Sequence, residues 1–209
     1  MDESILFLTM LIIITIIYAY LERKKSQFSY FKSNINGESY LVREDMEDSQ
    51  EASDMLAKIS INCSKLVDHL MKPEQIDGNM KHLKDRILSL KNRWNPKNIS
   101  ESSPDNKYTS YSINKGEKIV FCLRDKNMPY RLTDINTIMF VAIHELTHLM
   151  TEEIGHPPIF WKHMASLLKE SIDIGIYTPV DYKINPKLYC GMEINNTPCD
   201  HTNCSDIPH

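Results

Sequence analysis

The chain opens with an apolar run that few soluble folds could bury. Ile5 to Leu21 is 17 residues long and contains no charged side chain. As an α-helix it would be roughly 26 Å long, close to the thickness of the hydrocarbon core of a bilayer. A helix buried in the core of a soluble domain is the alternative. We expect residues 1–25 to form a single transmembrane anchor, with the membrane contacted through residues 5–21.

The flanks of the run argue against a cleaved signal peptide and set an orientation. Asp2 and Glu3 precede it, where a signal peptide would be basic, and it ends in aromatic residues without a small-residue cleavage site. Residues 23–25 are all basic. Because basic flanks stay on the cytoplasmic side, we expect the rest of the chain to face the cytosol. The five cysteines are odd in number and lack the spacing of a disulfide framework, which agrees with a reducing compartment.

The remaining length suits one domain with a hydrophobic core. The 209 residues are 42% hydrophobic and 25% charged, which is typical of a globular protein. The net charge of −4 weighs against a protein whose main role is to bind nucleic acid, but it does not exclude a local basic patch. Residues 81–93 form such a patch, and we expect a helix with a solvated lysine face there.

Hydrophobic periodicity predicts a mixed α+β domain at residues 51–195, preceded by a tether at 26–50 and followed by a tail at 196–209. Two amphipathic helices are expected between residues 51 and 95, and two short strands at 108–113 and 118–124. The next helix begins at an N-cap, Thr133 or Asp134, and Gly155 can end it. Pro157 and Pro158 then start a further helix.

The helix that follows the strands carries the sequence HELTH, residues 144–148. His144 and His148 are four residues apart, so they project from one helical face and can bind one Zn²⁺. Glu145 lies where its carboxylate can reach a water molecule that the metal activates. A solvated helix with two histidines is the alternative. The capped amphipathic helix around the motif favours the metal site.

Such a site needs a third protein ligand and an open position for water. His156 is the strongest candidate, because it follows a glycine at which the chain can turn back. Glu152, Glu153 and His163 are the rivals. Glu152 lies too far along a continuing helix, and His163 falls inside the next helix, where a structural role is expected.

These residues resemble those of a known family. HELTH followed by GHPPIFW (residues 155–161) is similar to the SprT/Spartan-like and WLM-type zinc metallopeptidases, and residues 189–192 (YCGM) extend a similarity to WLM-like proteins of large DNA viruses. The resemblance implies a small zincin-like domain that hydrolyses peptide bonds in protein or peptide substrates. It also implies that His144, His148 and His156 bind Zn²⁺ and that Glu145 is the catalytic acid–base.

Some features depart from related patterns. The third histidine lies eight residues after the second, whereas metzincins have six, so that clan is not matched. SprT-type repair proteases carry DNA-binding modules, and this chain has a membrane anchor in their place. DNA–protein crosslinks are therefore in doubt as substrates, and nucleic acid is not an expected partner.

The sequence leaves the roles of several residues open. Tyr177, Tyr182 and Tyr189 follow the site, and one of them could stabilise an oxyanion, although packing is the simpler role for each. Near the C-terminus there are enough ligands for a second zinc, but the paired spacing of a zinc knuckle is missing, and free thiols on a tail are the alternative. These ligands are Cys190, Cys199, His201 and Cys204.

Together these features predict a zinc metalloprotease anchored in a virion or host internal membrane, with its catalytic domain on the cytosolic side. A zincin-fold scaffold or binding module with weak turnover is the first alternative. A SprT-like, DNA-associated protease is the second.

Overall fold

The described part of the chain combines five α-helices with two small β-sheets, which confirms the predicted α+β class. The computed structural model describes residues 3–25, 27–126 and 131–198. The helices are α1 (Glu3–Lys25), α2 (Ser49–Leu70), α3 (Lys84–Arg93), α4 (Ile135–Met150) and α5 (Pro158–Asp173), with a π-helical turn at Gln75–Asn79 and a 3-10 turn at Lys81–Leu83. The strands are β1 (Phe28–Lys32), β2 (Ser39–Arg43), β3 (Ile99–Glu101), β4 (Tyr111–Ile113), β5 (Lys118–Phe121), β6 (Lys187–Tyr189) and β7 (Met192–Ile194).

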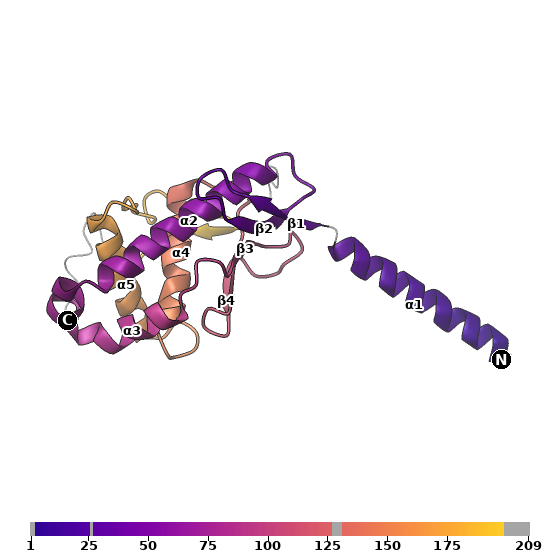
Figure 1. Ribbon diagram of the computed structural model, residues 1–209, viewed down its shortest axis with the longest axis horizontal. Helices are drawn as coiled ribbons and strands as arrows, with labels where there is room; N and C mark the ends of the chain where they lie inside the picture. Colours follow the sequence, from indigo (N-terminus) through magenta and orange to yellow (C-terminus); the bar gives the residue numbers. More distant parts are fainter. Residues whose placement is uncertain (1–2, 26, 127–130, 199–209) are drawn as a thin grey trace.

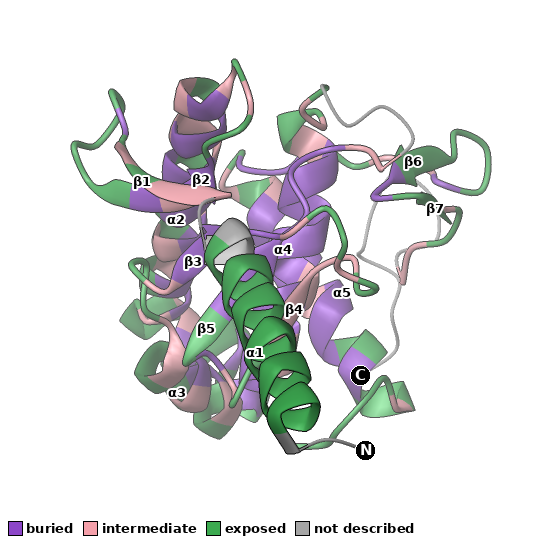
Figure 2. Cartoon of the chain, turned by 90° about the vertical axis from the view of Figure 1, so that its right-hand side faces the viewer, coloured by how far each residue is buried: buried purple, intermediate pink, exposed green. Residues whose placement is uncertain are grey.

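Helix α1 stands apart from the rest of the molecule (Figure 1). Its segment Ser4–Glu22 has a mean hydropathy of 2.4 and is long and apolar enough to cross a membrane. None of that segment is buried against the domain, and Figure 2 shows it exposed along its length. The alternative of a helix buried in the core of its own domain is therefore wrong.

The main sheet has the strand order β1-β2-β3-β5-β4. Strands β2, β3 and β5 run parallel to one another, and β1 and β4 pair antiparallel at the two edges. Residues 26–50, expected to be a tether, thus contain two strands of this sheet. The domain begins before residue 51, while its predicted end near residue 195 stays a prediction.

A buried charge network explains why this segment is ordered. Glu101 at the end of β3 accepts hydrogen bonds from the backbone N–H of Arg43 and from Nε of Arg124, both at 2.8 Å. Arg124 also forms an ion pair with Asp48, just before α2. Because buried charges must be paired, the segment from β2 to α2 is fixed to the centre of the sheet.

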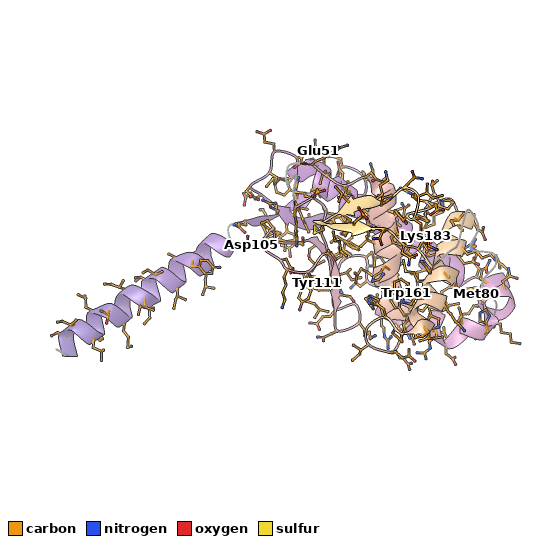
Figure 3. All side chains as sticks on the ribbon, turned by 180° about the vertical axis from the view of Figure 1, so that it is seen from behind. Glu51, Met80, Asp105, Tyr111, Trp161 and Lys183 are labelled. Atoms are coloured by element: carbon orange, nitrogen blue, oxygen red, sulfur yellow. A yellow bond between two sulfur atoms is a disulfide. The ribbon has the colours of Figure 1, made fainter. Side chains whose placement is uncertain are left out.

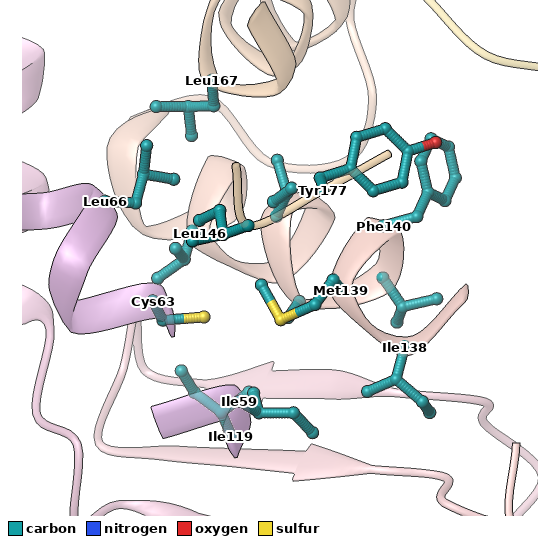
Figure 4. Close-up of a cluster of buried hydrophobic side chains, with 14 of the residues drawn as sticks. Ile59, Cys63, Leu66, Ile119, Ile138, Met139, Phe140, Leu146, Leu167 and Tyr177 are labelled. Atoms are coloured by element: carbon teal, nitrogen blue, oxygen red, sulfur yellow. The ribbon is translucent and has the colours of Figure 1, made fainter. Parts of the chain in front are cut away.

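The hydrophobic core lies between the sheet and the helices. Helix α2 packs on β2 and β3 and also contacts α4, which in turn contacts α3, α5 and β4. Figure 4 shows side chains from these elements meeting around Met139 of α4. The core members labelled there from α2, β5, α4 and α5 are Ile59, Cys63, Leu66, Ile119, Ile138, Met139, Phe140, Leu146 and Leu167.

The second predicted helix is interrupted. Its apolar positions continue through residues 76–90, but the chain forms the π-helical and 3-10 turns before α3 begins at Lys84. Gly78 has a non-helical backbone (φ −111°, ψ −108°), which breaks the helix. Glycine lacks the side chain that would restrict this backbone, so the periodicity alone did not reveal the break.

Candidate metal centre

Helix α4 presents the first two histidines. The Asp134 carboxylate accepts a hydrogen bond from the Thr137 backbone N–H at 2.9 Å, which confirms the N-cap expected at 133–134. One helical turn separates His144 from His148, and their Nε2 atoms lie 3.2 Å apart. The helix therefore directs two ring nitrogens to one point.

The helix ends at Met150, five residues before the glycine that was expected to stop it. The Lys115 ammonium donates to the carbonyl oxygens of His148, Thr151 and Glu153 at 3.2, 2.7 and 3.3 Å. Arg93 donates to the carbonyl of Leu149 at 2.7 Å. Two cations thus satisfy carbonyls that a longer helix would have paired internally.

Lys115 reaches this position from the turn between β4 and β5. Asn114 and Lys115 both have positive φ angles, 46° and 55°, as in the two-residue turns that join antiparallel strands. A Cβ on Gly116 would lie 2.5 Å from the Arg93 carbonyl oxygen. The turn is therefore packed tightly against the end of α3.

Beyond α4 the chain turns back and brings the third histidine to the first two. Gly155 adopts φ +78°, a conformation open to glycine, and His156 follows it. The Nε2 atoms of His156 and His144 are 3.0 Å apart. One ring nitrogen from each of the three histidines lies within 4.8 Å of the other two. The structure thus brings together the three residues predicted as ligands.

Aromatic rings support the cluster. Phe160, in the first turn of α5, lies 4.9, 4.5 and 4.7 Å from the ring centres of His144, His148 and His156. Trp161 stacks on His156 at 5.6 Å and stays 42% exposed. The histidines are therefore held against an apolar surface that excludes water from one side.

The surroundings keep these imidazoles neutral. Burial, together with the neighbouring His148 and His156, lowers the pKa of His144 to about 3. Burial, His156 and Lys115 lower the pKa of His148 to about 4, and burial also lowers the pKa of His156. At neutral pH each ring can offer a lone pair.

Glu145 lies on the buried side of the same turn. Its side chain is 3% exposed, and burial raises the pKa of its carboxyl group to about 8. Its Oε2 atom has no hydrogen-bond partner among the described residues. A buried carboxyl group without a protein partner is suited to exchange a proton with a molecule in the site.

The donor set fits zinc. Imidazole nitrogens about 2.0–2.1 Å from a tetrahedral ion would be about 3.3 Å apart, close to the 3.0 and 3.2 Å that separate His144 Nε2 from His156 Nε2 and His148 Nε2. Three neutral histidines with space beside them are also the ligand set of a catalytic zinc site, which leaves one position open.

The rival ligands lie elsewhere. Glu152 and Glu153 pair with Arg86 at 3.1 and 3.6 Å. His163 is buried, and its Nδ1 atom is 2.8 Å from the Thr151 hydroxyl, which agrees with the structural role expected for it. This contact also secures the point where α4 ends.

The three tyrosines differ in position. Tyr177 and Tyr182 pack against Phe140, at ring distances of 6.1 and 4.8 Å. Tyr189 lines the same cleft as Glu145, with its hydroxyl 2.6 Å from the Ser110 Oγ atom. Burial raises the pKa of Tyr189, so it stays protonated.

A disulfide joins Cys190 to Cys122, which corrects the expectations for the cysteines. Cys190 is neither a free thiol nor a ligand of a second zinc, and the other predicted ligands (Cys199, His201 and Cys204) lie outside the described residues. The bond links the end of β6 to the residue after β5, 68 positions apart. Sequence spacing did not reveal it because the two cysteines meet only through the fold.

A disulfide is typical of oxidising surroundings, so cysteine usage no longer supports a reducing compartment.

An open cleft of about 740 Å³ surrounds the histidines. Its floor is α4, and its walls come from β4 with the residues before it, the 154–161 segment, and the β6–β7 hairpin. Apart from the histidines and Glu145, the lining residues that the sequence singled out are Gly155, Trp161, Tyr189 and Met192, which belong to the GHPPIFW and YCGM segments. Side chains that reach the cleft from β4 and from residues 193–196 carry no motif, so only the fold reveals them.

We predict that Cys122→Ala combined with Cys190→Ala lowers the free energy of unfolding by about 2–4 kcal/mol, because the cross-link no longer restricts the unfolded chain. Urea unfolding of the full chain in detergent would measure this. Dithiothreitol should lower the stability of the wild type to that of the variant and leave the variant unchanged. Recovery of both residues as alkylated thiols from purified protein kept under oxidising conditions would contradict the disulfide.

The chain is similar in sequence to known proteins. Residues 61–197 match the WLM domain family. An uncharacterized protein of Acanthamoeba polyphaga mimivirus is 37% identical over 183 residues, which cover 88% of this chain and 90% of the relative. An uncharacterized protein of invertebrate iridescent virus 6 is 24% identical over 161 residues, covering 76% of this chain and 85% of the relative.

Among solved structures, Wss1 from Saccharomyces cerevisiae is 21% identical and aligns with a TM-score of 0.47, over 64% of this chain and 86% of that chain. The family match covers most of the domain, and the mimivirus relative matches along nearly its whole length. The resemblance of the HELTH and GHPPIFW segments is thereby confirmed, and the chain belongs to the WLM domain family.

Proposed function

We propose that this protein is a membrane-anchored zinc peptidase that hydrolyses peptide bonds in the cleft beside His144, His148 and His156. The observation that carries the proposal is the convergence of three neutral imidazoles next to a buried, unpartnered carboxyl group. Membership of a metallopeptidase-like family supports it. Protein or peptide substrates follow from the open cleft, which has room for an extended chain.

The histidines and Glu145 would have different roles in the reaction. His144, His148 and His156 would hold Zn²⁺, which when bound supplies Lewis acidity that activates water and polarises a carbonyl group. Glu145 would accept the proton of the attacking water and deliver it to the leaving amine. Its Oε2 atom, which has no hydrogen-bond partner among the described residues, is available for both halves of this exchange.

Helix α1 would hold the domain at a membrane. The basic flank at residues 23–25 favours a domain on the cytosolic side, whereas the Cys122–Cys190 disulfide favours oxidising surroundings. A virion membrane satisfies both, because a domain that faces the cytosol before budding is afterwards enclosed in the particle, away from cellular reductants. The large DNA viruses among the relatives support this location.

We predict that His156→Ala removes most of the bound zinc, because two histidines alone cannot complete the site. Zinc per chain, measured by mass spectrometry after dialysis against a weak chelator, should fall from about one to near zero. His82→Ala changes an exposed histidine outside the cleft and should keep the full zinc content. Equal zinc in both variants would remove His156 from the ligand set.

We predict that Glu145→Gln lowers the rate of peptide cleavage by at least about 10²-fold while zinc stays bound, because the amide cannot accept the proton. Glu152→Gln, an exposed and ion-paired neighbour, is the control and should stay near wild-type activity. Stoichiometric zinc without cleavage of any unfolded protein would favour a scaffold. Cleavage that requires added DNA would favour a DNA-associated protease.

We predict that the full chain stays in the membrane fraction after carbonate extraction, because the apolar surface of α1 is not covered by the domain. A variant with Ile12 and Ile16 both changed to Arg should shift to the soluble fraction. Release of the unaltered chain would contradict the anchor.

A further inference from the structure

The cleft is bordered by large apolar side chains that are left exposed to solvent. Ile154, two residues before His156, is 94% exposed, and Trp161 on the same wall is 42% exposed. Met192, on the opposite wall in β7, is 51% exposed, and Ile194 is half-buried beside it. Apolar groups gathered around a concave site, in contrast to ones scattered singly over a surface, indicate that the site binds an apolar partner.

The third wall offers main-chain groups. Strand β4 is an edge of the main sheet, paired on one side with β5. Residues 109–112, at and just before this edge, line the cleft, and Figure 3 shows Tyr111 and Trp161 on the same side of the domain. Within the described chain no strand pairs with the other side of β4, so an extended polypeptide could form hydrogen bonds there.

The charges of the cleft argue against a nucleic acid as its occupant. Lys115 is the one lysine or arginine among the described lining residues, and its ammonium is hydrogen-bonded to three carbonyl oxygens. Two lining residues, Glu145 and Glu193, are acidic. A phosphate backbone needs several available cations, and this cleft does not offer them.

The hairpin that carries Met192 is fixed in place. Cys190, between β6 and β7, forms the disulfide with Cys122, and the Tyr189 hydroxyl is bonded to Ser110 beside β4. The apolar wall opposite Ile154 is therefore attached at two points to the sheet that supports the metal centre. A wall held in this way can select a side chain by size and polarity.

We propose that the cleft selects polypeptide segments with a large apolar side chain next to the bond to be cut, and that Ile154, Trp161 and Met192 form the subsite that binds it. Such side chains are mostly buried in folded proteins, so the substrates are unfolded or extended segments. The inference rests on the proposed peptidase function and specifies its substrate class.

Binding can be tested separately from cleavage. The full chain carrying Glu145→Gln, zinc-loaded and placed in lipid nanodiscs, would be titrated into two fluorescent decapeptides of equal charge, one with Leu-Phe at its centre and one with Ser-Asn. Fluorescence anisotropy should show the apolar peptide binding at least about tenfold more tightly, as expected for burial of one large side chain.

Matched variants locate the subsite. Ile154→Ser and Met192→Ser should each weaken binding of the apolar peptide by about three- to tenfold and leave binding of the polar peptide unchanged. Leu188→Ser alters an exposed residue of the same hairpin outside the cleft, and Ile184→Ser a similarly exposed isoleucine; both should bind as the parent does. All four positions are exposed, so little loss of stability is expected.

The outcomes separate the two proposals. Equal affinity for the two peptides, or equal losses in the control variants, would overturn the apolar subsite. Tighter binding of a single-stranded DNA decamer than of the apolar peptide, lost in Ile154→Ser, would also overturn it. Selective binding of the apolar peptide, combined with no cleavage of it by zinc-loaded wild type, would support the subsite and refute the peptidase. Cleavage of both peptides at the same rate would support the peptidase and refute the apolar subsite.

Discussion

The candidate metal centre depends on the point at which α4 ends. His156 lies eight residues beyond His148, and on a continuous helix it would be about 12 Å further along the axis. Lys115 and Arg93 bind the last carbonyl groups of α4, so the helix stops at Met150 and the chain can return. The third imidazole reaches the first two because the helix stops here, where two cations from other parts of the sequence replace the hydrogen bonds of the next turn.

The same arrangement sets the chemistry of the site. Phe160 lies against all three imidazoles, and the Glu145 carboxyl group is buried in the same turn of α4 as His144. Low access to water lowers the pKa of the histidines and raises that of the glutamate. The candidate ligands are thus neutral and the pKa of the carboxyl group is raised, and burial is the largest cause of both effects.

Local patterns predicted much of this site. The i, i+4 histidines, the Asp134 cap and the proline start of α5 are set by residues close in sequence, so they could be read directly. His156 was predicted from a glycine that permits a reversal, although the helix stopped earlier than Gly155. The sequence did not reveal the contacts between distant segments. These are the hydrogen bonds of Lys115 at the end of α4, the Cys122–Cys190 disulfide, and the pairing of β2 with β3 that places residues 28–43 in the sheet. Strand pairing and cross-links are decided by partners far along the chain, and a five-residue strand such as β1 is too short to show a clear period of its own.

The short connection between α1 and the sheet limits how far the domain can move from its anchor. A flexible linker of 25 residues would allow a domain to move roughly 25–30 Å from its anchor. Here β1 begins at Phe28, three positions after α1 ends at Lys25, so almost no free chain separates the anchor from the sheet. Anchored in a bilayer, the domain would work within a thin layer at the membrane surface. Polypeptides would meet its cleft there only by coming to the membrane themselves.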